Sequence, residues 1–497
     1  MVFNSIEFAV FLFVAFFLYW FIFNKDHRIQ NLFIVVASYV FYGWWDWRFL
    51  FLIAFTSACS FGAGLLIDKY KETPGKAKAV NIVNIILNLL ILGIFKYYDF
   101  FVTSFADAFL GGKTDGMLLK VILPVGISFY TFQALSYSID VYRGKLEPTR
   151  DIVQFFAFVS FFPQLVAGPI ERATNLLPQF GAARTFKYEE GVDGLRQILW
   201  GLFKKMVVAD NCAIYVDQVF SSYQTQSGST LLLAAVFFAF QIYGDFSGYS
   251  DIAIGTAKLF GIKLMQNFKV PYFSRDIAEF WRRWHISLTT WFRDYVYIPL
   301  GGSRCSKAKI VRNTFVIFLL SGFWHGANWT FITWGAYHAL LFLPLILMEK
   351  NRKYRNTVAE GSLLPSLKEV GQMLLTFFLV TIGWIIFRSE SVEQAWDYIC
   401  GMSQLGTLKA SYRFFIQKGT WYYSLFILLM LFVEWVNRMQ EHGLQVPYGN
   451  QLIKGSMGIN LSRKLKTAFR WTFYLLIVIL IYHFGEFSSQ QFIYFQF

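Results

Sequence analysis

Three stretches of the chain carry side chains that could do chemistry, and the first is GFWHGANW at residues 322–329. Its His325, next to Trp324, lies between segments that look like membrane spans, where a neutral imidazole has one donor and one acceptor that need partners. An ionisable side chain there indicates a functional site by default, and imidazole suits a general base. On a helix, Asn328 would lie one turn from His325 and could fix its tautomer. The alternative is a structural histidine that bridges two helices.

The second stretch, SRDIAEFWRRWHISLTTWFRD at residues 274–294, combines His285 with arginines and acids. A charge at the centre of a bilayer costs at least ~2.5 kcal/mol, so this stretch lies at the cytoplasmic face or lines a water-filled cavity. On a helix, Arg282 would neighbour His285, and Glu279 would pair with Arg283. The planar arginine side chains could also bind the phosphates of a cofactor. The alternative is a charged face that contacts solvent or headgroups.

The third stretch, QIYGDFSGYSDIAIG at residues 241–255, introduces Asp245 and Asp251 into an otherwise apolar run. Buried carboxylates must be paired, and the arginines of residues 275–293 are the obvious partners. The pattern therefore favours a scaffold, which holds the arginine-rich segment in place, over a catalytic pair.

The composition indicates a polytopic membrane protein. The 497 residues are 56% hydrophobic and only 15% charged, which is too little charge for the surface of a soluble protein of this length. The net charge of +14 comes from short basic clusters between apolar runs, as in cytoplasmic loops, so nucleic-acid binding is not expected. The four cysteines are scattered, without a CxxC pair or a histidine at ligand spacing, so we expect no metal site and no disulfide framework.

Apolar runs near the ~20 residues of a membrane helix predict an all-α fold with roughly ten to a dozen crossings, plus re-entrant or interfacial helices. The clearest runs are 6–23, 80–101, 119–139, 152–169, 328–348, 370–387, 421–437 and 468–484. The first run reads as a retained span, since no small-residue cleavage site follows it. Basic residues follow the first run but do not precede it, which predicts an extracytoplasmic N-terminus. No internal repeat is visible, so we expect one membrane-embedded domain over residues 1–497.

The basic clusters around His325 suggest its depth in the membrane. Clusters at 304–312 and 350–355 predict cytoplasmic ends, and the interval 313–348 is shorter than the ~40 residues and a turn that two full spans need. A limb of residues 313–323 rises about 17 Å, which brings His325 to mid-membrane, with a break permitted by Gly322 and Gly326. A single long tilted helix is the alternative, and it also keeps His325 away from the surfaces.

In order along the chain, several segments together resemble the membrane-bound O-acyltransferase (MBOAT) family, in its bacterial branch that includes the membrane subunit of alginate O-acetylation. The resemblance runs nearly end to end. The segments are MVFNSIEF, LPVGISFYTFQALSYSIDVYRG (123–144), FFPQLVAGPIER (161–172), YGDFSGYSDIAIG (243–255), NFKVPYFSRDIAEFWRRWHISLTTWFRDYVYIPLGG (267–302), GFWHGANWTFITWGAYH (322–338) and FIYFQF (492–497).

The resemblance implies tilted helices around a thin central region with a channel. It implies that His325 is the essential histidine, with His285 as a second histidine on the donor side. We expect His325 to act as general base, Asn328 to orient it, and Arg282 and Arg283 to hold the donor with His285. The donor would be acetyl-CoA or an acyl-carrier thioester, with no permanently bound cofactor.

The resemblance also implies a multi-pass protein of the bacterial cytoplasmic (inner) membrane. Expected partners are the lipid bilayer, a polysaccharide acceptor, an extracytoplasmic acyltransferase and a cytoplasmic acyl carrier protein. The acceptor stays open among alginate-like exopolysaccharide, cellulose and peptidoglycan. The alternatives are D-alanyl transfer to teichoic acid by the same fold, a proton-coupled transporter or flippase, which would predict internal repeats, and a non-catalytic scaffold of an export complex.

Overall fold

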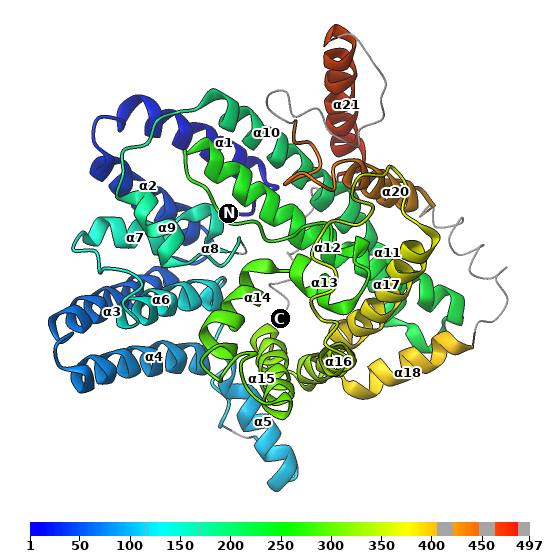
Figure 1. Cartoon of the computed structure of the whole chain (residues 1–497), viewed down its shortest axis with the longest axis horizontal. Coiled ribbons are helices and arrows are strands. Elements are labelled where there is room, and N and C mark those ends of the chain that lie inside the picture. Colours follow the sequence, from blue (N-terminus) through cyan, green and yellow to red (C-terminus); the bar gives the residue numbers. More distant parts are fainter. Residues whose placement is uncertain (115, 167, 405–420, 447–462, 486–497) are drawn as a thin grey trace. The chain divides into compact units, whose positions relative to one another are not determined.

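The computed structural model describes residues 1–114, 116–166, 168–404, 421–446 and 463–485. Within these ranges the chain forms helices and no strand, which confirms the predicted all-α class (Figure 1). The terminal segment FIYFQF at 492–497, which contributes to the resemblance, lies outside the described residues.

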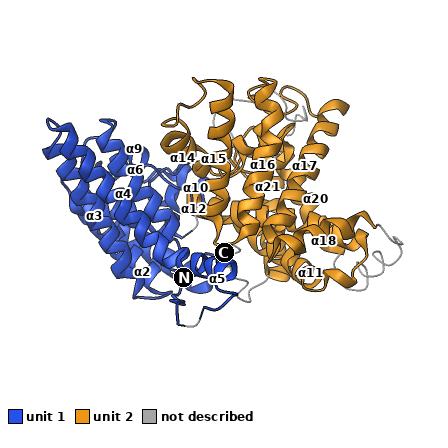
Figure 2. Ribbon diagram, turned by 90° about the horizontal axis from the view of Figure 1, so that it is seen from below, with its two compact units in different colours: residues 1–194, 256–265 blue, residues 195–255, 266–497 orange. Residues whose placement is uncertain are grey.

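The helices belong to two compact units, which Figure 2 colours separately. Unit 1 comprises Met1–Gly194 and Thr256–Met265, and unit 2 comprises Leu195–Gly255 and Gln266–Phe497. Two helices, α10 (Tyr188–Leu202) and α12 (Gly228–Leu259), contain residues of both units. The expectation of one membrane-embedded domain stays a prediction.

Unit 1 is built from helices that begin at recognisable signals. Asp26 caps the second helix by accepting the backbone N–H of Arg28, and Pro74 opens the fourth, where its missing N–H costs nothing. The helices are α1 (Ile6–Phe17), the π-helix η1 (Leu18–Ile22), α2 (His27–Gly43), α3 (Phe49–Lys69), α4 (Pro74–Lys96), α5 (Tyr98–Phe109), α6 (Ile127–Tyr142), α7 (Ile152–Ser160), α8 (Phe162–Leu165) and α9 (Ala173–Phe180).

Two predicted spans of unit 1 are wrong as continuous helices. The run 119–139 is irregular until Gly126, whose positive φ of 75° precedes the start of α6. The run 152–169 is interrupted between α7 and α8, where Pro163 lies in the first turn of α8. Most residues of α6 and the second half of α7 are buried inside the unit, so these helical parts of the two runs contact protein.

Unit 2 holds all the residues that the sequence marks for chemistry. Besides most of α12, its elements are the π-helix η2 (Phe203–Ala209), α11 (Asp210–Ser221), the short helices η3 (Tyr223–Thr225) and η4 (Pro271–Phe273), α13 (Ile277–Arg283), α14 (Ile286–Phe292), the π-helix η5 (Arg293–Tyr297), α15 (Lys307–His325), α16 (Trp329–Leu347), α17 (Leu367–Arg388), α18 (Val392–Ser403), α20 (Trp421–Val436) and α21 (Arg463–Phe484).

By length and composition, six helices among the described residues could cross a membrane: Phe49–Lys69, Pro74–Lys96, Gly228–Leu259, Trp329–Leu347, Leu367–Arg388 and Thr467–Phe484. Two shorter apolar helices cover Ile6–Ile22 and Trp421–Val436. The chain is thus a multi-pass membrane protein. The number of ten to a dozen crossings and the extracytoplasmic N-terminus stay predictions, since both depend on a membrane position that helix lengths do not give.

The helices α15 and α16 lie side by side as an antiparallel hairpin (Figure 1). A side chain on Gly322 would meet the backbone of Phe331, and one on Gly335 would meet the backbone of Phe318. Glycine at both positions therefore lets the two helices approach closely, as small residues do in membrane bundles. Each helix has 19 residues. The helix α15 is longer than the limb expected from the sequence because it begins at Lys307, within the basic cluster 304–312. Of the two, only α16 is among the described helices that are long and apolar enough to cross a membrane, so the estimate that two full spans do not fit between residues 313 and 348 stays a prediction.

Candidate active site

His325 is the last residue of α15, at the turn of the hairpin. The chain leaves the helix at Gly326 and enters α16 at Trp329, so the predicted break is confirmed in position. At about 1.5 Å per residue, the 19-residue α15 places His325 some 27 Å from its start. Its mid-membrane depth stays a prediction, because the longer limb carries it further than the 17 Å of the sequence estimate.

Asn328 does not sit one helical turn from His325, and that expectation is wrong. The helix ends between them, and the Asn328 side chain caps α16 by accepting the backbone N–H of Thr330 at 3.0 Å. Its amide also donates to the carbonyl oxygen of Glu390 at 2.9 Å. Asn328 therefore fixes the start of α16 and joins it to the end of α17, and both hydrogen-bonding groups of its side chain have backbone partners.

Aromatic rings surround His325. Its ring centroid lies 5.1 Å from that of Trp324, 5.2 Å from that of Trp334 and 5.2 Å from that of Phe387, all at steep interplanar angles. His325 and Trp324 are both buried, at 6% and 3% exposure. These rings come from α15, α16 and α17, so three helices fix the position of the imidazole.

His285 lies between α13 and α14, where the backbone is strained. Its φ of 43° and ψ of 54° are left-handed, a conformation that costs a residue other than glycine about 1 kcal/mol or more. The helical reading of this segment is thus wrong, and Arg282 is not a neighbour of His285 on a continuous helix. The strain lets the 1% exposed imidazole point into the unit, against Phe246 at 4.6 Å and Trp324 at 5.9 Å between ring centroids.

The two histidines therefore contact the same indole, that of Trp324. The two histidines are 40 positions apart in the sequence, His285 in a charged segment and His325 in an apolar one. Burial lowers the pKa of His285 to about 3, and no nearby charge contributes to the shift. The His285 ring is accordingly neutral at physiological pH.

The arginines of the second stretch are occupied by protein groups. Glu279 pairs with Arg283 at 2.9 Å, as predicted, and with Arg275 at 3.0 Å. Arg283 also donates to the carbonyl oxygen of Asn356 at 3.1 Å. Arg282 donates to the carbonyl oxygens of residues 351 and 354, at 2.8 and 2.6 Å. These bonds tie the segment to the loop after α16, so holding a donor by Arg282 and Arg283 stays a prediction.

The expected pairing of Asp245 and Asp251 with those arginines is wrong. Lys204 lies 2.6 Å from Asp251, and Lys205 lies 2.6 Å from Asp245 and 2.8 Å from Asp210. Both lysines are on the π-helix η2 and are buried, at 3% and 5% exposure. We call the following set the lysine cluster: Lys204, Lys205, Asp210, Asp245, Asp251 and Glu434.

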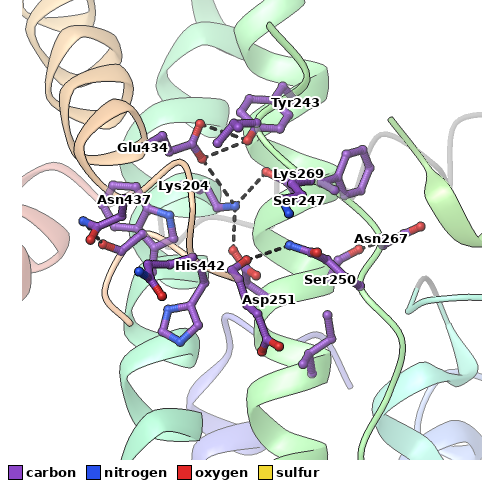
Figure 3. A pocket seen from close by; sticks show the side chains of 18 residues that line it. Lys204, Tyr243, Ser247, Ser250, Asp251, Asn267, Lys269, Glu434, Asn437 and His442 are labelled. Atoms are coloured by element: carbon purple, nitrogen blue, oxygen red, sulfur yellow. Dashed lines mark hydrogen bonds and ion pairs between the residues drawn. The ribbon is translucent and has the colours of Figure 1, made fainter. Parts of the chain in front are cut away.

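A small polar cavity adjoins the lysine cluster (Figure 3). Lys204 reaches the Ser247 hydroxyl at 2.9 Å there, and the Tyr243 hydroxyl donates to Glu434 at 2.8 Å. The cavity has a volume of about 30 Å³, which accommodates one or two water molecules. A thioester substrate is much larger, so this cavity is part of the scaffold beside the histidines.

A sequence model of the MBOAT, membrane-bound O-acyltransferase family, matches residues 147–362. A protein of Pseudomonas aeruginosa named probable alginate O-acetylase AlgI is 41% identical over 412 residues, which are 83% of this chain and 76% of that protein. This chain belongs to the MBOAT family. As a member it is a membrane-embedded acyltransferase.

Two further MBOAT relatives differ in the group or acceptor that their names state. A peptidoglycan O-acetyltransferase of Helicobacter pylori is 35% identical, and the aligned region covers 76% of this chain and 74% of that protein. A teichoic acid D-alanyltransferase of Bacillus subtilis is 30% identical, and the aligned region covers 54% of this chain and 69% of that protein.

The MBOAT match includes both histidines, the arginine segment and the two aspartates, but Glu434 lies beyond it. Sequence reasoning missed Lys204 and Lys205, which lie in the segment FKKMVVA (203–209) and are buried. It also missed Asn267, which contacts His285. Two adjacent lysines in an apolar run were a usable signal, whereas a lone asparagine in a connector was not. Among the described residues, no three His, Cys, Asp or Glu side chains are grouped to hold a metal ion.

Proposed function

We propose that this MBOAT protein takes an acetyl group from a cytoplasmic thioester and passes it toward the hydroxyl groups of an extracytoplasmic polysaccharide. The observation that carries the proposal is the shared contact of His285 and His325 with Trp324, in a buried site ringed by aromatic side chains. The relatives named for alginate and peptidoglycan O-acetylation support acetyl as the transferred group.

In this proposal His325 is the general base. An acceptor hydroxyl loses its proton to the imidazole as its oxygen attacks the thioester carbonyl carbon. The carbon–sulfur bond then breaks, and the proton passes to the departing thiolate, so that one ester and one thiol are formed. Base catalysis of this kind contributes about 10²- to 10⁴-fold to the rate. His285 lies on the donor side, and Trp324 contacts both imidazoles.

The donor is acetyl-CoA or an acetylated carrier protein, and we favour no permanently bound cofactor. The proposed setting is the bacterial cytoplasmic membrane, with the N-terminus outside. An extracytoplasmic acyltransferase would complete transfer to the polymer, and a cytoplasmic acyl carrier protein would deliver the donor. The basic clusters at 304–312 and 350–355 support a cytoplasmic position for that end of the hairpin.

D-alanyl transfer to teichoic acid is the second candidate, supported by the Bacillus subtilis relative at 30% identity. It uses the same thioester chemistry, and it differs only in the acyl group and the acceptor. The transporter and scaffold alternatives have no such support, since the relatives' names state enzymatic transfer.

The decisive experiment incubates the purified protein, in lipid nanodiscs, with radiolabelled acetyl-CoA or acetylated carrier protein and short polysaccharide acceptors. We expect label in the acceptor, and about 10²- to 10⁴-fold less in His325→Ala protein of equal monodispersity. A D-alanyl thioester run in parallel separates the two candidates. Wild-type transfer by His325→Ala would exclude the assigned base.

A further inference from the structure

Asn267 is an uncharged residue in the connector between α12 and α13, and its side chain lies against His285. The Asn267 Oδ1 atom is 3.0 Å from His285 Nδ1. The same oxygen accepts the Ser287 hydroxyl at 2.9 Å and the Ser287 backbone N–H at 3.4 Å. The side-chain oxygen of Asn267 thus contacts three polar groups at the start of α14: His285 Nδ1, the Ser287 hydroxyl and the Ser287 N–H.

The orientation of this amide follows from its partners. A backbone N–H can only donate, so the Asn267 atom that faces Ser287 must be the oxygen. On the other side, Asn267 Nδ2 donates to the Ser250 hydroxyl of α12 at 3.0 Å. The Asn267 main-chain oxygen accepts the Ile286 N–H at 2.8 Å, which holds the connector beside the residue after His285. Figure 3 shows Asn267 and Ser250 together at the rim of the polar cavity.

These contacts determine the tautomer of His285. A carbonyl oxygen accepts, so Nδ1 must carry the proton, and Nε2 of a neutral ring then has a lone pair. His285 Nε2 is buried and has no hydrogen-bond partner among the residues that the structure describes. Leaving a buried polar atom unpaired costs about 1–3 kcal/mol, and a protein tolerates that cost where a ligand supplies the missing partner.

We propose that Asn267 is a positioning residue of the acyl-transfer site, which holds His285 in the Nδ1–H tautomer so that Nε2 accepts a hydrogen bond from an N–H group of the acyl donor. The inference rests on the proposed function for the identity of the ligand. The tautomer itself depends only on the contacts between Asn267 and His285.

Two independent features of His285 agree with this role. The left-handed backbone is a local strain that the surrounding packing maintains, as is common where a side chain must be aimed at a substrate. Burial also keeps the ring neutral, with a pKa of about 3, so that the lone pair of Nε2 is available at physiological pH.

The direct test is nitrogen NMR of protein labelled with ¹⁵N-histidine, in nanodiscs and without substrate. Resonances of His285 are assigned by their loss in His285→Gln. We expect a protonated Nδ1 and an unprotonated Nε2 in the wild type, and a mixture or exchange of the two forms in Asn267→Leu. A protonated Nε2 in the wild type, or an unchanged tautomer in Asn267→Leu, would overturn the inference.

Asn437→Leu is the matched control. Asn437 lines the same polar cavity, but its amide donates to the carbonyl oxygens of Val433 and Gly443 and has no contact with His285. We expect the wild-type tautomer in this variant. If Asn267→Leu does not fold, Ser250→Ala removes the hydrogen bond that orients the Asn267 amide, and the same spectra show whether the Nδ1–H form becomes less populated.

Kinetics separate positioning from simple structural support. We expect kcat/KM for acetyl transfer to fall at least tenfold in Asn267→Leu, since a wrong tautomer removes the acceptor. Asn267→Asp keeps an acceptor at Nδ1 and should recover activity at high pH, with an acidic limb shifted upward because the carboxylate stabilises the imidazolium. Equal pH profiles in the two variants would contradict the proposal. If the wild type transfers no acetyl group, the proposed function fails while the NMR result stands.

Discussion

The lysine cluster and the histidine site lie in the same unit and are both buried, yet they are stabilised in different ways. In the lysine cluster each lysine of η2 contacts two or more acceptors from α11, α12 or α20. At the histidine site most neighbours are aromatic rings, Asn267 is a neutral hydrogen-bond partner of His285, and Nε2 of His285 has no partner among the described residues. A buried polar group whose donors and acceptors are all bonded within the protein supports the fold. A buried polar group with a donor or acceptor that lacks a partner can bind a ligand.

The arginine segment follows the pattern of the lysine cluster. Arg275 and Arg283 meet Glu279, and Arg282 meets backbone carbonyl oxygens. The density of charge in the sequence thus marked the parts that hold the unit together. His285 and His325, the groups proposed for chemistry, lie in the neutral, aromatic part, where charge gives no signal.

The largest expected effect comes from breaking the lysine cluster. Lys205→Ala leaves Asp210 and Asp245 without their cation in a buried place, and the loss of one partner of a buried ion pair costs about 3–5 kcal/mol. We expect a low yield of monodisperse protein and a much lower thermal midpoint. Combining Lys205→Met with Asp210→Asn and Asp245→Asn removes the uncompensated charge and should recover most of the loss. Wild-type stability of Lys205→Ala would show that the cluster is dispensable.

A smaller effect is expected at the hairpin that carries His325. Gly322→Ala places a methyl group against the backbone of Phe331, and overpacking of this kind costs about 1–3 kcal/mol. Because α16 must then move from the end of α15, acetyl transfer should fall along with the thermal midpoint. Gly371→Ala is the control: a side chain there meets nothing within 4 Å, and alanine favours the helix by up to about 1 kcal/mol. Equal behaviour of the two variants would argue against a close helix contact.

The pH dependence of stability should reveal the buried His285. Its pKa is about 3 in the folded protein and near 6.5 in the unfolded chain, so the unfolded chain binds more protons between these values. The contribution of His285 to the free energy of unfolding should therefore be constant well above pH 6.5 and fall by about 1.4 kcal/mol per pH unit well below it. Thermal midpoints between pH 7.5 and 5 should fall less steeply in His285→Gln than in the wild type. Identical slopes in His285→Gln and the wild type would show that His285 is not buried as a neutral ring.

The smallest effect is expected for a charge pair outside both regions. Lys307 and Glu349 are exposed and 2.9 Å apart, and solvent and salt screen such pairs. Lys307→Ala should leave the thermal midpoint unchanged within error. A clear decrease would mean that surface charge, and not only the buried clusters, stabilises this end of the hairpin.

The sequence was sufficient to find both histidines, the helix break beside Gly326 and the pair of Glu279 with Arg283. Each of these depends on local spacing or on a motif. The partners of Asp245 and Asp251 could not be found this way. Lysines are expected at the surface, but both lysines of the π-helix η2 are buried. The role of Asn267 depends on a contact between residues 18 positions apart across a left-handed turn, which no periodicity encodes.

The rings of Trp324, Trp334 and Phe387 surround His325, whose side chain is buried. A thioester is an energy-rich compound that water destroys without benefit to the cell, and a base placed near bulk solvent would speed that loss as readily as the useful reaction. With His325 in its proposed role as base, the aromatic lining would give the protein fidelity of a chemical kind, measured as the ratio of acetyl groups delivered to acetyl groups hydrolysed. Replacing one of these rings by a smaller side chain would show its cost first as free acetate.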